Sequence, residues 1–384
     1  MGRNRPGRRL AVAALATAIA PSVRAGPGTW TVTGEAGAEE DTNVERVETG
    51  PGLPDTPVAA PMLRFGARVD GRDRLAGGGY TLTLSDLTRI DADGDVPIEN
   101  VTLVAGDVRW LHPLGERPVS LGAGLTAADA IPLSDAVGDR TFWNVGGDVL
   151  LAAHDGDDRR MLLAIGWRSF VYKPVPTHDY DWTGPVANAR FDFVLWHSPE
   201  RTRSLDVAAM FGFEARSYDG AAYVTTCPSG AEASPNCFAP TSLARFDRYQ
   251  RAAVEATWSG RQIVTAGYQL YVIDSNSFGE SLVRHRAYAS VTSELPGGLY
   301  GTLLGILEID KYLDGLVVGT DVVHQDFANI EDENRSSLQA RLARKVTPDL
   351  AIEARAAIWR NLGTTSMDVE FHRELYTLGV VYTR

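Results

Sequence analysis

Histidine and cysteine are the residues of this chain best suited to catalysis or metal binding, and neither type forms a recognisable catalytic pattern. The seven histidines are scattered through predicted turns, loops and strand ends. No G-x-S-x-G, H-E-x-x-H or phosphate-loop spacing occurs, so no nucleophile is supplied with a neighbouring base and no nucleotide site is indicated. We therefore expect a protein without enzymatic activity and without a cofactor.

Four carboxylates cluster in the segment DADGDVPIE, at Asp91, Asp93, Asp95 and Glu99. Oxygen ligands at this density are what Ca²⁺ prefers. Gly94, however, comes too early for the glycine of an EF-hand loop. A solvated acidic turn is the favoured interpretation, and a calcium site is the alternative.

A larger set of charged residues alternates with apolar residues along predicted strands. If those strands form a closed sheet, one face of it carries both signs of charge and lines a hydrophilic channel whose charges set its selectivity. The alternative is an interior closed by ion pairs. The candidate channel-lining residues are Arg64, Arg68, Asp107, Arg109, Arg190, Asp192, Glu214, Arg216, Arg251, Glu255, Arg284, Arg286, Arg341, Glu353 and Arg355.

The elements that would position these charges show a period of two residues. Apolar and polar residues alternate in ANARFDFVLW (187–196), in SLDVAAMFGFEAR (204–216) and in the terminal ELYTLGVVYTR (374–384). Alternation over such lengths predicts strands, and it recurs along the whole chain. Helical periodicity competes only near 335–346, where flanking strands and the break at Thr347-Pro348 favour a strand.

Connections of two lengths separate the predicted strands, and the short and long classes alternate. The short turns are predicted at 70–74, 113–118, 155–158, 198–201, 259–260, 295–298 and 346–349. The mostly longer loops are predicted at 40–58, 86–98, 127–140, 173–184, 218–243, 275–281, 313–333 and 362–367. This order predicts an all-β fold, an up-and-down antiparallel transmembrane barrel of about 16 strands with all long loops at one end.

A barrel also explains the modest mean hydropathy of −0.14. Only the outward half of each strand touches lipid, so only that half must be apolar. Beyond the N-terminal segment no apolar run of 18 residues occurs, which predicts that no helix spans a membrane. Aromatic residues near strand ends are expected to form girdles at the two membrane interfaces. They are Trp30, Tyr80, Trp110, Trp143, Trp182, Trp258, Tyr376 and Tyr382.

Residues 1–25 have the pattern of a secretory signal peptide. A basic start, MGRNRPGRR, is followed by the short apolar run LAVAALATAIA and by the small-x-small sequence Val23-Arg24-Ala25. We predict cleavage after Ala25 and a barrel over 26–384. Export to an oxidising compartment favours a disulfide between Cys227 and Cys237, with two free thiols as the alternative.

With its signal peptide, alternating strands, turn asymmetry and C-terminal strand, the chain resembles bacterial outer-membrane β-barrel proteins of the porin-like kind. The last strand is similar to the assembly signal of such proteins, but Tyr382 is followed by Thr383 and Arg384 instead of ending the chain. The resemblance implies a location in the bacterial outer membrane, in contact with its lipid. No motif assigns the chain to one barrel family.

These observations predict a passive pore for small hydrophilic solutes. The alternative is a structural barrel within a multiprotein envelope complex for secretion, surface-protein export or gliding, with envelope proteins as partners. A formal net charge of −12 argues against a nucleic-acid partner. The sequence does not specify an oligomeric state.

Overall fold

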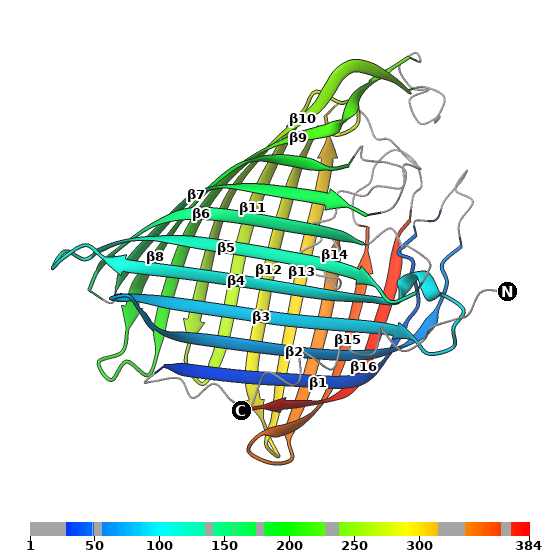
Figure 1. Ribbon diagram of the computed structural model, residues 1–384. Coiled ribbons are helices and arrows are strands. Elements are labelled where there is room, and N and C mark those ends of the chain that lie inside the picture. Colours follow the sequence, from blue (N-terminus) through cyan, green and yellow to red (C-terminus); the bar gives the residue numbers. More distant parts are fainter. Residues whose placement is uncertain are drawn as a thin grey trace, which may run out of the picture.

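The computed structural model shows a closed, all-antiparallel barrel of sixteen strands (Figure 1). The structure describes residues 28–47, 49, 56–134, 141–156, 158–173, 180–226, 238–313, 335–361 and 370–384. The predicted signal peptide (1–25) and the two cysteines lie outside these residues, so both predictions stay predictions. Among the described residues no helix is long and apolar enough to cross a membrane.

Each strand pairs with its two neighbours in sequence, as expected for an up-and-down barrel. The strands of the first half are β1 (Thr29–Asp41), β2 (Ala60–Leu75), β3 (Gly78–Asp91), β4 (Val101–Pro113), β5 (Val119–Pro132), β6 (Phe142–Asp155), β7 (Arg159–Tyr172) and β8 (Trp182–His197). Those of the second half are β9 (Ser204–Thr225), β10 (Phe238–Ser259), β11 (Gln262–Ser275), β12 (Leu282–Leu295), β13 (Leu299–Tyr312), β14 (Ser336–Lys345), β15 (Leu350–Arg360) and β16 (His372–Thr383). One short 3₁₀ helix, η2 (Pro97–Glu99), lies between β3 and β4.

The first and last strands close the barrel. The register of β1 with β16 runs from Thr33 opposite Thr383 to Asp41 opposite Leu375. Beyond it, the amide of Val32 donates to the carbonyl of Arg384 at 2.8 Å, and the amide of Arg384 donates to the carbonyl of Val32 at 2.9 Å. The ordered C-terminal strand is therefore a requirement of closure, because without it β1 and β15 would each expose an edge.

The two faces of the sheet differ in chemistry. Residues paired across strands share a face, and large apolar side chains gather on the outer one. Val149, Ile165 and Leu378 are 62%, 68% and 63% exposed. An exposed apolar belt on a closed sheet is the lipid-facing surface of a membrane barrel. The predicted fold class, a transmembrane up-and-down barrel, is confirmed.

Most aromatic residues predicted for the girdles lie on the outer face near strand ends. On the short-turn side Trp30 contacts Tyr80 edge to face, with ring centroids 6.5 Å apart, and the Trp110 indole N–H donates to the Leu75 carbonyl at 2.9 Å. On the long-loop side Trp143 is 37% exposed. Trp182 is an exception.

The Trp182 side chain is 8% exposed and belongs to the inner face. It stacks on Phe170, whose ring stacks on Phe142, at centroid distances of 6.0 and 5.2 Å. With Tyr172 and Tyr218 these rings form a buried apolar cluster inside the long-loop end of the barrel. Part of the interior is therefore packed by aromatic side chains.

Several predicted connections are shorter than expected because the strands continue through them. The turn predicted at 70–74 is wrong: β2 runs to Leu75, and the turn is Ala76-Gly77, with φ of 51° and 75°. Two residues of positive φ suit a tight hairpin. Two of the charged residues that suggested a turn lie on the inner face of β2 instead, where Asp70 accepts from the Arg68 Nε at 2.6 Å and Arg72 donates to the Thr29 hydroxyl at 2.7 Å.

The loops predicted at 86–98, 127–140 and 218–243 likewise begin or end inside strands. β3 continues to Asp91 and β5 to Pro132. β9 and β10 each have 22 residues, against at most 16 in the other strands, and they extend past their neighbours at the long-loop end (Figure 1). Polar residues in these segments had the composition of loops, but a strand that leaves the bilayer needs no apolar face.

One carboxylate lies on the outer face in the middle of the apolar belt. Asp86 of β3 pairs with Ala67 and Val104, both outward positions. Residues directly opposite one another on successive strands form a row around the barrel. Followed in one direction, the row through Asp86 reaches Tyr382 of the short-turn girdle three strands away. Followed in the other direction, it reaches Trp143 of the long-loop girdle, also three strands away. Such rows climb a barrel steadily because the strands tilt, so Asp86 lies near mid-height.

Asp86 makes no ion pair with any residue that the structure describes. A carboxylate facing hydrocarbon is unfavourable, although less so than a lysine or arginine at the same depth. We expect Asp86→Leu to raise the free energy of unfolding by about 1–2 kcal/mol, and Asp86→Asn by less. Urea unfolding of the protein folded into lipid vesicles measures the change.

Asp148→Asn is the matched control, because it removes a carboxylate from the inner face of the same barrel. It should leave the unfolding free energy nearly unchanged. If Asp86→Leu lowers the stability instead, the carboxylate does not face hydrocarbon in the folded protein.

Candidate functional site

The inner face carries the charges, and the register places every predicted channel-lining residue on that face. Arg251 and Glu255 of β10, for example, alternate with Val254, which is 49% exposed on the outer surface. Many of these inner charges fall into two groups. The first, which we call the seam wall, comprises Glu35, Glu39, Asp41, Arg64, Arg89, Arg341, Glu353, Arg355 and Arg373. The second, which we call the basic wall, comprises Arg109, Arg168, Arg190, Arg216, Arg251, Arg284 and Arg286.

Asp41 is the centre of the seam wall. Its carboxylate accepts from the Arg89 Nη2 at 2.8 Å and from the Arg373 Nη2 at 2.6 Å. All three side chains are at most 1% exposed. Arg89 also pairs with Glu39 of β1. The last residue of β1 therefore links β3 on one side to β16 on the other through buried, charge-assisted hydrogen bonds.

Glu35 makes a second connection across the closure, six residues before Asp41 on β1. Its Oε1 lies 2.7 Å from the Arg64 Nη2 and its Oε2 lies 2.9 Å from the Arg355 Nη2. Arg355 and Arg341 both pair with Glu353. Charges of alternating sign therefore run from β2 across the closure to β14.

Sequence reasoning missed the most buried members of this wall. Arg89 fell within the predicted loop 86–98 and Asp41 within the predicted loop 40–58, while Arg373 lies directly before the predicted strand segment 374–384. The alternation along the strand was the signal that could have found Arg89. Thr83, Ser85 and Leu87 precede it on alternate positions, so all four side chains lie on the same face. The pairing of Asp41 with Arg373 follows only from closure, since 332 residues separate them.

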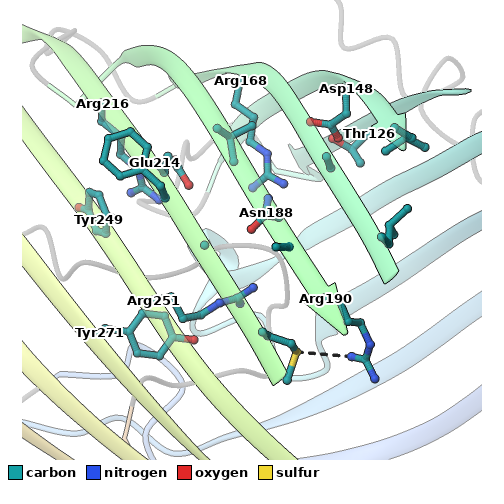
Figure 2. Close-up of a pocket in the computed structure, with 18 of the residues that line it drawn as sticks. Thr126, Asp148, Arg168, Asn188, Arg190, Glu214, Arg216, Tyr249, Arg251 and Tyr271 are labelled. Atoms are coloured by element: carbon teal, nitrogen blue, oxygen red, sulfur yellow. Dashed lines mark hydrogen bonds and ion pairs between the residues drawn. The ribbon is translucent and has the colours of Figure 1, made fainter. Parts of the chain in front are cut away.

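The basic wall lines a cavity of about 450 Å³ inside the barrel. Strands from β4 to β12 contribute to it, and Figure 2 shows Arg168, Arg190, Arg216 and Arg251 directed from neighbouring strands toward the same space. Seven arginines line this cavity, against the two carboxylates of Asp148 and Glu214. Arg168 and Asp148 were absent from the predicted set, although their strand alternates in the same way.

Arg216 of the basic wall is held by two aromatic rings as well as by a carboxylate. Its Nε donates to Glu214 Oε1 at 2.7 Å. Its guanidinium lies 4.3 Å from the ring centre of Trp182 and 4.0 Å from that of Tyr249. Cation–π contacts on both sides fix the side chain in place. The aromatic cluster and the arginines are therefore adjoining parts of one interior surface.

Arg284 and Arg286, predicted together, meet two carboxylates of β13. Arg284 contacts Asp310 at 2.6 Å and Glu308 at 3.3 Å, and Arg286 contacts Glu308 at 3.8 Å. Ion pairs of this kind hold the guanidinium groups near the wall and reduce their net field. Arg109 and Arg190 are similarly paired, with Asp107 at 3.1 Å and Asp192 at 2.8 Å.

The acidic segment 91–99 forms a turn at the long-loop end. The Asp91 carboxylate accepts from the amide of Asp93 at 3.2 Å and from the amide of Val96 at 2.6 Å, so it organises the backbone. Asp93 and Asp95 are exposed. Within the described part of the chain no group of three or more His, Cys, Asp or Glu side chains is placed to hold a metal ion.

A separate charged cluster lies where the long hairpin β9–β10 leaves the barrel. Arg245 donates to Asp247 Oδ2 at 2.7 Å and to Glu280 Oε1 at 2.8 Å. Glu280 belongs to the connection between β11 and β12, outside the strands. Burial raises the pKa of Glu280 to about 7. The positive charge of Arg245 lowers this pKa, and the negative charge of Asp247 raises it further.

No protein-family model matches the sequence, and no curated protein matches it. Solved barrels do match the structure. The Salmonella typhi OmpF complex with daunomycin is 10% identical, with a TM-score of 0.44 over 92% of this chain and 97% of that one. Acinetobacter baumannii OccAB1 is 9% identical, with a TM-score of 0.46 over 93% and 96%.

A mutant of the Rh. blastica porin is 8% identical, with a TM-score of 0.37 over 93% of this chain and 100% of that one. The solved structures that the chain is similar to are thus bacterial outer-membrane porins and channels. The likeness concerns fold alone.

The seam wall predicts a large difference between buried and exposed carboxylates. Asp41→Asn removes a buried carboxylate that binds both the Arg89 and the Arg373 guanidinium groups, which should lower the unfolding free energy by about 3–5 kcal/mol. Urea unfolding in lipid vesicles, followed by tryptophan fluorescence, measures the loss.

Asp70→Asn is the matched control, because Asp70 pairs with Arg68 where the two side chains are 42% and 54% exposed. An exposed pair contributes at most about 1 kcal/mol. Equal effects of the two substitutions would contradict the role assigned to the seam wall.

Glu280 predicts a pH dependence. Its pKa is about 7 in the folded protein against an ordinary 4.5, so the stability it contributes is complete below its ordinary pKa and is lost as pH rises through 7. The unfolding free energy should fall by roughly 1–3 kcal/mol between about pH 5 and about pH 8. Glu280→Gln should make the unfolding free energy nearly independent of pH in this range, whereas Glu200→Gln, in an exposed turn, should leave the dependence as it is. The same pH dependence in the unchanged protein and in both variants would contradict the role given to Glu280.

Proposed function

We propose that the chain is a passive outer-membrane pore for small hydrophilic solutes, with a preference for anions. Solutes would cross by diffusion along the charged interior, without chemistry and without a cofactor. The supporting observation is the cavity inside the barrel, whose lining includes seven arginines and two carboxylates, and of these arginines Arg168 and Arg251 make no ion pair with the described residues. A water-filled passage with such a wall attracts anions and offers them hydrogen bonds in place of their hydration shell.

The distribution of charge around the interior supports the anion preference. Carboxylates of β1 pair with four arginines of the seam wall, whose side chains are at most 28% exposed, and Arg341, paired with Glu353 of β15, is 51% exposed. Arg109 and Arg190 of the basic wall have side chains that are 50% and 44% exposed although both are paired. The positive potential of the lumen therefore comes from one side, and a permeating anion would pass along that side.

Planar-bilayer recordings of the refolded protein test the proposal. We expect stable channel openings and a reversal potential in a potassium chloride gradient that indicates anion preference. The double substitution Arg109→Gln and Arg190→Gln removes two lumen charges and should shift the reversal potential toward that of a cation-selective channel. Heat-modifiable gel mobility checks that each variant is folded.

Asp70→Asn and Asp86→Asn serve as controls, because the first lies on the seam side of the interior and the second on the outer surface. Neither should shift selectivity toward cations. A protein that folds but never opens, or one that prefers cations, would contradict the proposed function.

A further inference from the structure

Two arginines of the basic wall differ from the other five. Arg168 of β7 and Arg251 of β10 make no ion pair with the part of the chain that the structure describes. The other five each have a carboxylate within 4.0 Å: Arg109, Arg190, Arg216, Arg284 and Arg286. A guanidinium without a protein anion retains its full capacity to bind one from solution.

A glycine makes room for Arg168. The cross-strand neighbours of Arg168 are Gly146 on β6 and Gly184 on β8. A Cβ at position 146 would lie 2.9 Å from the Arg168 Cγ and 3.0 Å from the Thr126 Oγ1. A side chain there would displace Arg168 from its path across the wall. Gly146 therefore leaves room for the Arg168 side chain, whereas Gly184 makes room for the Ala215 carbonyl of β9.

A third glycine brings Arg251 together with an amide. Gly212 of β9 is the cross-strand partner of both Arg251 and Asn188. A Cβ at position 212 would lie 3.4 Å from the Arg251 Nε and 3.0 Å from the Asn188 Oδ1. The two side chains therefore lean over the same glycine from opposite strands. Asn188 adds an amide group to the guanidinium donors.

Figure 2 shows Arg168, Asn188 and Arg251 on one stretch of the cavity wall, with Asn188 between the two arginines. Asp148 lines the same cavity but makes no ion pair with Arg168 among the described residues. The two free guanidinium groups thus stay uncompensated, although a carboxylate is present on the next strand.

We propose that Arg168, Asn188 and Arg251 form a binding site for the oxyanion group of a permeating solute, a carboxylate or a phosphate. The site rests on the proposed function as a pore and adds a specific step to it. Planar guanidinium donors bind such groups through paired hydrogen bonds, and an amide N–H completes the set. Diffusion would then pass through a saturable site, and the current would depend on which anion occupies it.

The test adds inorganic phosphate, or acetate, to single channels conducting chloride. We expect a saturable reduction of the chloride current by at least one of the two anions. Arg251→Gln and Arg168→Gln should each weaken that binding about tenfold, the loss expected for a charged hydrogen-bonding partner. Whichever of phosphate and acetate binds more tightly identifies the oxyanion class that the site prefers.

Two variants separate a binding site from general attraction by charge. Arg109→Gln removes the same charge from the same cavity but takes away no proposed ligand-binding group, so it should shift the reversal potential and leave anion affinity within about twofold. Gly212→Ala changes no charge, but its Cβ displaces Asn188 and Arg251. It should weaken anion binding while leaving the reversal potential unchanged.

The site and the pore can fail separately. If the channel is anion-selective but shows no saturation with either anion, or if Arg109→Gln weakens binding as much as Arg251→Gln, the site is overturned and the pore stands. If the protein never conducts, calorimetric titration of the detergent-solubilised barrel with phosphate and acetate still decides the site. Binding that Arg251→Gln abolishes supports the site, and no binding overturns it.

Discussion

The pairing of β1 with β16 is the interaction on which the rest of this structure depends. In hydrocarbon each unpaired backbone N–H or C=O costs several kcal/mol, so a sheet can cross a membrane only when it has no edge. Every strand between these two takes part in two ladders, and closure gives the first and last strands the same. With every pair of neighbours antiparallel, closure also requires an even number of strands, as the sixteen of this barrel satisfy.

Closure also separates two environments within every strand. Side chains on alternate positions face either lipid or the interior, and only the first must be apolar. The interior side is free to carry charge, and it is used differently around the circumference. Near the closure, carboxylates of β1 pair with arginines of β2, β3, β15 and β16, so charge there holds strands together. On the far side arginines outnumber acids around an open cavity, so charge there faces solution.

The fold was predictable from sequence because a barrel repeats one pattern many times. Alternation in segments such as 204–216 and the order of turn lengths fixed the strands, their faces and their neighbours. The ends of strands were less predictable. Residues 70–74 and 86–91 have the composition of turns, yet they extend β2 and β3, because charged inner-face residues are indistinguishable in sequence from those of a loop.

The residues of the candidate site were predictable where the alternation along a strand shows which side chains face the interior. Arg251 and Arg216 belonged to clear alternations, whereas the importance of Arg168 depends on the glycine opposite it on β6. Contacts between strands that are distant in sequence, such as Asp41 with Arg373, follow from register and not from local pattern. Trp182 shows the same limit, since its place in the interior depends on which residue of β8 faces Phe170.

The position of Asp41 has a consequence for the order in which the molecule is assembled. Each hairpin joins neighbours in sequence and closes a short loop, but Asp41 and Arg373 are 332 residues apart, which makes their contact among the most entropically demanding in the chain. Asp41 meets Arg89 within the first three strands, but it meets Arg373 only after the last strand has arrived. A chain interrupted before β16 therefore retains two open edges and lacks the second guanidinium that Asp41 binds, so this contact is made only in a complete barrel.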